Sequence, residues 1–222
     1  DVAGPTPVCN NETATYRTPR VGTHTYAWSL PLGGGTIIGS NTLDSVVVQW
    51  TNSGIYRVKV TETGSEARSD SMNVTVNPLP PDNNTVSDPS VCEGATAGIM
   101  VYSTNPGLTL QLRRNDNNNP VGAPVSSGPG GDITINVIPA STTVYNVLVT
   151  NEYGCSTQII DLSTVTVNPL PVPSISGTNN SCQGSVFTYS TEGGMTNYTW
   201  VVTDIDPTAA HTIVSGGSST DN

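Results

Sequence analysis

Positive charge is scarce in this sequence. Of its 222 residues only 7 are Lys or Arg, against 17 Asp or Glu, and the formal net charge is -10 at pH 7. The only lysine is Lys59. Nucleic acid binding needs a basic surface that displaces counterions from the phosphates, and anionic membrane surfaces attract basic segments. The composition therefore predicts no nucleic acid partner and no electrostatic attachment to a membrane.

Long apolar runs and helical periodicity are also missing. No stretch approaches the roughly 20 apolar residues of a membrane-spanning helix, so we expect no direct membrane insertion. No segment keeps a 3.6-residue hydrophobic period, which argues against long helices. The chain begins at Asp1 without a signal peptide and stops at Asn222 within a repeat. We therefore expect a segment of a longer protein, with any export signal removed or lying outside it.

Histidines and metal-binding cysteine patterns are few. His24 and His211 stand apart in polar segments, and neither a CxxC pattern nor a Gly-x-Ser-x-Gly elbow occurs. Nucleophilic catalysis needs a Ser or Cys, a base and an orienting group, and zinc sites need closely spaced Cys and His ligands. The sequence predicts no enzyme, no catalytic residue and no metal site, with both histidines as ordinary surface residues.

Close acidic pairs are limited to Asp204 with Asp206 and Glu62 with Glu66. Paired carboxylates can hydrolyse glycosidic bonds, but both pairs fall in predicted loops, where acidic residues are mostly solvated. Calcium prefers oxygen ligands, which are dense at the first pair and around Asp116 in an Asn-rich turn. Neither segment matches a complete calcium loop, so no cofactor is predicted and calcium is only a weak alternative.

What the sequence does contain is a repeat. Val-Asn-Pro-Leu-Pro occurs at residues 76–80 and 167–171, 91 residues apart, which is the length of one small β-sandwich domain. Each copy follows a Thr-Val alternation typical of a last strand, and its prolines favour an extended, semi-rigid connector. The sequence predicts all-β sandwiches at 1–80 and 81–171 and an incomplete one at 172–222, joined by short proline-rich linkers.

The three repeats open alike, with a cysteine at positions 9, 92 and 182. In the first and third, a tyrosine follows seven residues later, and then comes a Tyr-x-Trp segment: Tyr26-Ala27-Trp28 and Tyr198-Thr199-Trp200. A buried tryptophan after the first cysteine is typical of immunoglobulin-type sandwiches. These aromatic residues would also suit a sugar-stacking platform, but core packing is favoured because large aromatics tend to be buried.

Two further strands of the first repeat are readable from their alternation. Val46, Val48 and Trp50 lie on one face of a predicted strand, as do Tyr56, Val58 and Val60 on the next. Tyr56 lies where a tyrosine corner is expected, with Val58 in place of the second cysteine of an antibody domain. The second repeat lacks tryptophan between its cysteines and has polar turns at 113–120 and 126–131, which predicts a related but distinct sandwich.

Four cysteines in an exported chain favour disulfide formation. Cys155 follows the strand that contains Tyr145, and Cys92 opens the same repeat. We therefore predict a Cys92–Cys155 disulfide that stabilises the second sandwich by about 4 kcal/mol. Cys9 and Cys182 are expected not to be bonded to each other.

The order of these motifs resembles that of the PKD-like and Ig-like repeats in giant cell-surface adhesins of gliding Bacteroidota that use type IX secretion. The relevant features are the opening cysteine, Tyr-x-Trp, Gly34-Gly35-Thr36-Ile37, Val-x-Trp, Gly-x-Tyr-x-Val-x-Val and the closing Val-Asn-Pro-Leu-Pro. The first repeat departs from the pattern at Asn11, where glycine is usual, and at Ser65, where cysteine is common.

The resemblance implies an extracellular, cell-surface stalk or adhesive array whose partners are other repeats and an unknown surface or polysaccharide ligand. It also implies Ser45 and Ser71 as candidate O-glycosylation acceptors, because both lie in an Asp-Ser-apolar pattern. Two alternatives stay open: an accessory region of an extracellular carbohydrate-active enzyme, and a filament subunit completed by strand donation. For residues 172–222 we expect order only where missing strands are supplied.

Overall fold

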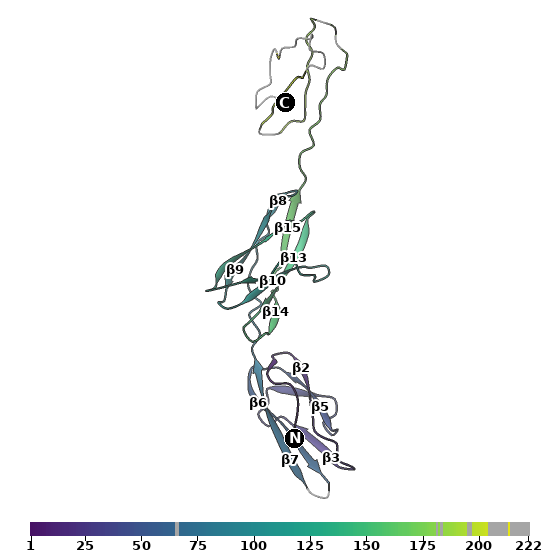
Figure 1. The fold of residues 1–222 in the computed structure, drawn as a ribbon, viewed down its shortest axis with the longest axis vertical. Helices are drawn as coiled ribbons and strands as arrows, with labels where there is room; N and C mark the ends of the chain where they lie inside the picture. Colours follow the sequence, from purple (N-terminus) through teal and green to yellow (C-terminus); the bar gives the residue numbers. More distant parts are fainter. Residues whose placement is uncertain (65–66, 181, 183, 195–196, 204–212, 214–222) are drawn as a thin grey trace. The chain divides into compact units, whose positions relative to one another are not determined.

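The structure is a computed structural model that describes residues 1–64, 67–180, 182, 184–194, 197–203 and 213 (Figure 1). Over these residues the regular secondary structure consists of strands alone, which confirms the predicted all-β class. None of them belongs to a helix long and apolar enough to cross a membrane. The chain forms two compact units, Asp1–Asn168 and Pro169–Asn222.

The first sandwich contains two sheets. One has four strands in the order β1 (Val8–Cys9), β7 (Arg68–Asn77), β6 (Gly54–Thr63) and β3 (Thr25–Ser29). The other has three strands in the order β2 (Thr13–Arg17), β5 (Ser45–Trp50) and β4 (Gly35–Ile38). The predicted alternation is confirmed, because Val46, Val48 and Trp50 on β5 are all at most 1% exposed.

Aromatic side chains occupy the centre of this sandwich. Trp50 and Tyr16 are fully buried, and the indole Nε1 of Trp50 donates to the hydroxyl of Tyr16 at 3.1 Å. Tyr26 and Trp28 are also buried, and the Nε1 of Trp28 donates to the carbonyl of Leu43 at 2.8 Å. A buried indole or phenol needs such a partner. The first Tyr-x-Trp pair therefore belongs to the core, as the core-packing interpretation predicts.

The tyrosine corner is confirmed in the first sandwich. The hydroxyl of Tyr56 donates to the carbonyl of Ser53 at 3.2 Å, and its ring stacks on Trp50 with centroids 5.8 Å apart. The ring also lies over Gly34, where an added Cβ would be 2.4 Å from it. With a φ of +81° as well, this position requires glycine.

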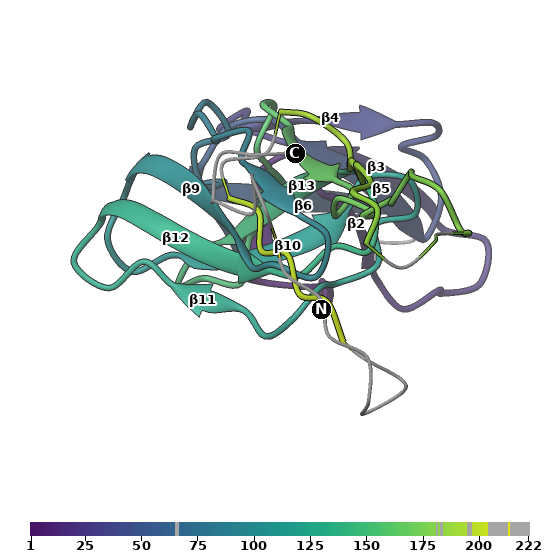
Figure 2. The ribbon, with the colours of Figure 1, turned by 90° about the horizontal axis from the view of Figure 1, so that it is seen from above.

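The second sandwich has a different layout, as predicted. One sheet has the order β11 (Val125–Ser126), β10 (Thr109–Arg114), β13 (Thr143–Thr150), β15 (Ser163–Asn168) and β8 (Ser90–Cys92), with β14 (Ser156–Gln158) on β13. The other sheet is the antiparallel pair of β9 (Ala97–Thr104) and β12 (Gly131–Val137), visible side by side in Figure 2. Its core shares no residue with that of the first sandwich.

Both sandwiches pair their first strand with their last strand in parallel. In the first, Cys9 on β1 lies opposite Asn77 on β7; in the second, Cys92 on β8 lies opposite Asn168 on β15. Because the first and last strands run in the same direction, the chain enters each sandwich at one end and leaves it at the other. The proline-containing linker therefore begins beside the opening cysteine.

The third repeat begins in the same way as the first. A Cβ on Gly4 would lie 2.3 Å from the ring of Tyr16, and a Cβ on Gly177 would lie 2.2 Å from the ring of Tyr189. Beyond this start, the described residues of 169–222 form no strand, and only one isolated bridge, Ser176 with Ser190, is present among them.

The Tyr16–Trp50 hydrogen bond yields a first prediction. Tyr16→Phe leaves the buried indole N–H of Trp50 without its acceptor, so unfolding should become easier by about 1–3 kcal/mol. Chemical denaturation followed by far-ultraviolet circular dichroism measures this loss. Tyr102→Phe, at a partly exposed tyrosine of the second sandwich, is the matched control. Equal stability of the two variants would contradict the assigned role of this bond.

Candidate functional site

A disulfide joins the two sandwiches. Cys9, at the end of β1, is bonded to Cys155, which lies in the hairpin between β13 and β14. Their Cα atoms are 5.6 Å apart and their separation in sequence is 146 residues. Cys155 is fully buried. The bond therefore connects the end of one sandwich to a buried hairpin of the next.

The predicted Cys92–Cys155 disulfide is wrong, because Cys92 is a free and exposed thiol. Cys92 lies level with Asn168, near the residues that pair with the start of β13, whereas Cys155 follows the end of β13. Eight strand residues span roughly 27 Å, and a disulfide needs Cα atoms within about 7 Å. Figure 1 shows β8 and β14 at opposite ends of the second sandwich. Cys182 is also a free thiol, so Cys9 and Cys182 are not bonded, as predicted.

The hairpin that contains Cys155 contacts the linker of the first sandwich. The side-chain Nδ2 of Asn151 donates to the carbonyl of Pro78 at 2.8 Å, while its Oδ1 accepts from the backbone N–H groups of Tyr153 and Cys155 at 3.1 and 3.0 Å. One amide group thus shapes the turn and attaches it to the linker. The contact lies close to the disulfide, because Pro78 directly follows Asn77, the residue opposite Cys9.

Cys92 occupies the same structural position in the second sandwich as Cys9 in the first. Backbone N–H groups of the turns that follow donate to the two cysteine carbonyls, Glu12 to Cys9 at 3.1 Å and Ala95 to Cys92 at 3.0 Å. The opening cysteines are thus equivalent between repeats, as the alignment predicts, although only one of the pair is bonded.

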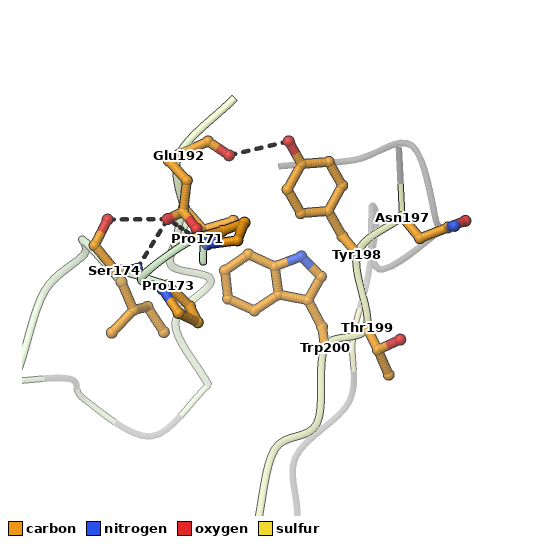
Figure 3. Close-up of a pocket in the computed structure, with 10 residues that line it drawn as sticks. Pro171, Pro173, Ser174, Glu192, Asn197, Tyr198, Thr199 and Trp200 are labelled. Carbon is orange, nitrogen blue, oxygen red and sulfur yellow. Dashed lines mark hydrogen bonds between the residues drawn. The ribbon is translucent and has the colours of Figure 1, made fainter. Parts of the chain in front are cut away.

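The second compact unit contains a groove of about 610 Å³ (Figure 3). Its lining consists of two prolines, two aromatic residues and six other side chains: Pro171, Pro173, Ser174, Ile175, Thr191, Glu192, Asn197, Tyr198, Thr199 and Trp200. Figure 3 shows the indole of Trp200 beside the rings of Pro171 and Pro173, while the hydroxyl of Tyr198 donates to the backbone carbonyl of Glu192 at 3.0 Å. The second Tyr-x-Trp pair is half-buried here, so its role as core or platform stays a prediction.

Hydrogen bonds hold the Glu192 carboxylate at the edge of this groove. The side chain of Thr191 donates to it, as do the backbone N–H and hydroxyl of Ser174, at 2.8 and 3.0 Å. These donors favour the charged form and lower the pKa of Glu192 from 4.5 to about 2, with Thr191 contributing most. The group is therefore an anion at any ordinary pH.

The predicted position of Glu62 in a loop is wrong, because Glu62 lies within β6. Its carboxylate contacts the Nδ1 of His24 at 2.7 Å, so this histidine is paired instead of isolated. The pairing of β3 with β6 brings His24, which directly precedes β3, close to Glu62. Local sequence does not reveal this long-range contact. Glu66, Asp204, Asp206 and His211 lie outside the described residues. In the part of the chain that is described, no three His, Cys, Asp or Glu side chains gather as a metal site would require.

Protein donors occupy the oxygen atoms of the Asn-rich turn considered for calcium. The Nδ2 of buried Asn146 donates to Asn115 Oδ1 at 3.2 Å and to Asn118 Oδ1 at 2.9 Å. Asp116 forms an ion pair with Arg114 at 2.9 Å, and this hydrogen-bonded guanidinium lowers the pKa of the carboxyl group. These hydrogen bonds and the ion pair stabilise the turn.

The two candidate glycosylation acceptors differ in exposure. Ser71 on β7 is exposed, whereas Ser45 at the start of β5 is partly buried. Asp70, which precedes Ser71, accepts a hydrogen bond from the backbone N–H of Val2 at 2.6 Å, and this bond lowers its pKa. Glycosylation needs an exposed acceptor, so the structure favours Ser71 of the two.

Residues 1–76, which correspond to the first sandwich, match the family model of the PKD-like domain. The resemblance predicted from the sequence is confirmed to this extent, as an Ig-like repeat. The narrower likeness to adhesins of gliding bacteria stays a prediction. No curated protein is similar in sequence to the chain.

Three of the solved structures that match the chain have low sequence identity and TM-scores below 0.5. The chain is similar to the I9-I11 tandem of titin (12% identity, 76% of this chain, 66% of that chain, TM-score 0.32). It is also similar to fibronectin(III)-like modules of Clostridium thermocellum CbhA (10% identity, 76% of this chain, 95% of that chain, TM-score 0.40). A third similar structure is that of the Yersinia pseudotuberculosis adhesin InvE (15% identity, 74% of this chain, 58% of that chain, TM-score 0.29). The chain thus spans 66% of the titin tandem and 58% of InvE.

The inter-sandwich disulfide yields a second prediction. Cys9→Ser or Cys155→Ser should destabilise the two sandwiches, because the bond closes one covalent loop that runs through both of them, with 146 residues between the cysteines in sequence. For a loop of that length the chain-entropy model gives about 5 kcal/mol as an upper figure. Denaturation of the full chain measures the loss, and Cys92→Ser serves as the unbonded-cysteine control. Non-reducing peptide mapping that joined Cys92 to Cys155 would contradict the assignment.

The Glu192 carboxylate yields a third prediction, on pH. Because its pKa is lowered in the folded state, its contribution to local order is fully present above pH 4.5 and is lost as the pH falls toward about 2. Carboxyl carbon NMR of the full chain should show a midpoint near pH 2, with the Ser174 amide signal following it. In Glu192→Gln that amide signal should no longer titrate. A midpoint near the ordinary value would disprove the hydrogen-bonded arrangement.

Proposed function

We propose that this chain is a structural repeat segment of a long, secreted cell-surface protein, in which tandem sandwiches form a stalk and contribute to attachment. The parallel pairing of first and last strands in both sandwiches carries this proposal. A domain whose chain enters at one end and leaves at the other is suited to an end-to-end array. A domain with both termini at one end would need long connections instead of short proline-containing linkers.

The cysteine chemistry and the composition support an extracellular location. Disulfides persist in oxidising compartments and are rare in the cytosol, and this chain has one between two domains. Its Thr-, Ser-, Asn- and Gly-rich, lysine-poor composition is typical of extracellular β proteins. The narrower assignment, to gliding motility and type IX secretion with Ser71 glycosylated, rests on the order of the sequence motifs alone.

The proposal includes no catalytic role and no cofactor. Ig-like and PKD-like domains are typically non-catalytic, although a fold alone does not set function. Within the described ranges, polar groups that might be read as a site serve the fold: Glu62 pairs with His24, and the Asn-rich turn is bonded to Asn146. The proposed partners are neighbouring repeats of the same protein and a surface or polysaccharide ligand.

The groove of the second unit favours one alternative, an accessory region of a carbohydrate-active enzyme. Half-buried Tyr198 and Trp200 beside a fixed carboxylate are groups that contact sugars. Binding of soluble polysaccharides by the full chain, lost in Trp200→Ala but kept in Tyr153→Ala at an exposed tyrosine, would show that the groove binds sugars. A non-repetitive catalytic domain in the full-length protein would then favour this alternative, whereas many further repeats would favour the stalk.

The stalk proposal can be tested in the source cell. Deleting residues 1–168 should weaken attachment while the rest of the protein stays on the surface, as antibody labelling of intact cells would show. Replacing them with two unrelated sandwich domains should restore attachment if they act as spacers. Attachment that is unchanged by the deletion would disprove the proposal, and failure of the replacement would instead assign a ligand-binding role to these repeats.

A further inference from the structure

We propose that the Cys9–Cys155 disulfide is a mechanical bypass: tension between the two ends of the chain passes through the bond, and the segment between the two cysteines is not stretched. The bypassed segment contains every strand from β2 to β13 and therefore nearly all of both hydrophobic cores. The purpose of the bypass rests on the proposed stalk function, whereas the bypass itself depends only on the bond.

The first step of the load path lies in the first sandwich. Tension applied at Asp1 reaches Cys9 through β1, which is held in parallel against β7 by the pairing of Val8 with Val76 and Cys9 with Asn77. Beyond Cys9 the backbone N–H of Asn10 donates to the carbonyl of Asn77 at 2.8 Å. Because the disulfide begins at Cys9, tension leaves the peptide chain there, before it reaches β2.

The second step lies in the second sandwich. Tension arriving at Cys155 continues into β14 and then β15, which ends at Asn168 directly before the next proline-containing linker. β15 pairs with β13 on one side and with β8 on the other. The loaded segment of this sandwich is therefore short and is held by two neighbouring strands.

The position of the bond limits the access of thiols to it in the folded chain, where Cys9 is partly buried. Cys155 is fully buried, and attack on a disulfide sulfur requires access for a thiolate. The hairpin that contains Cys155 is attached to the preceding linker through Asn151 and the carbonyl of Pro78. These contacts hold the two cysteines together before any tension is applied. Buried Cys155 contrasts with the exposed, free Cys92.

The bypass has a measurable length. The two cysteines are 146 residues apart, and a fully extended chain spans roughly 3.3–3.6 Å per residue. The bond therefore withholds about 500 Å of extension from the two sandwiches. The residues outside the bypass, 1–9 and 155–168, supply less than about 90 Å.

Single-molecule force spectroscopy of the full chain, held at its two ends, tests the proposal. The unmodified chain should release less than about 90 Å from these two sandwiches. The double variant Cys9→Ser/Cys155→Ser should release roughly 500 Å more, in two large steps. Cys92→Ser is the matched control and should behave as the unmodified chain. Residues 169–222 contribute equally to every variant.

A second measurement covers the case in which the double variant does not fold. The unmodified chain is held under a constant tension that extends residues 155–168 and so exposes the Cys155 sulfur, and a small thiol reductant is then added. The withheld length of about 500 Å should then appear, and only with the reductant present. Two large unfolding steps in the unmodified chain without reductant would overturn the proposal. Loss of cell attachment on deleting the repeats tests the stalk function separately, so either idea can fail while the other stands.

Discussion

The parallel pairing of the first and last strands is the constraint on which the rest of this structure depends. It places Cys9 beside Asn77 in one sandwich and Cys92 beside Asn168 in the next. Because the linker starts at the following residue, the opening cysteine always lies at the end of a sandwich where the chain leaves. In the first sandwich that position makes Cys9 a neighbour of the second sandwich, to which it is bonded through Cys155.

Much of the fold could be predicted because it depends on local patterns. Alternation placed Val46, Val48 and Trp50 in the core, and the local segment around Tyr56 identified it as a corner residue. The disulfide could not be predicted in this way. Aligning repeats shows which cysteines are equivalent, but it does not show that Cys155 lies at the opposite end of its own sandwich from Cys92.

The two Tyr-x-Trp segments show how one motif acquires different surroundings. In the first sandwich β3, which contains Trp28, pairs with β6, and Trp28 is 2% exposed. In the third repeat the equivalent Trp200 is half-buried and lines a groove beside two prolines. The start of the two repeats is the same, since Tyr16 and Tyr189 each lie against a glycine with no room for a side chain. The predicted core packing is therefore confirmed for the first pair alone, because core packing depends on the strands that pack against the motif.

A disulfide between domains has consequences that one within a domain lacks. The first sandwich already has a dense core around Trp50, with Val58 in place of a second cysteine, so a cross-link inside it would add only to its own stability. The Cys9–Cys155 bond instead closes one loop through both domains, worth about 5 kcal/mol for this length in the chain-entropy model. While the bond is intact the two ends of that loop stay joined, so neither domain can extend. In the proposed stalk the cross-link would thus limit extension as well as add stability.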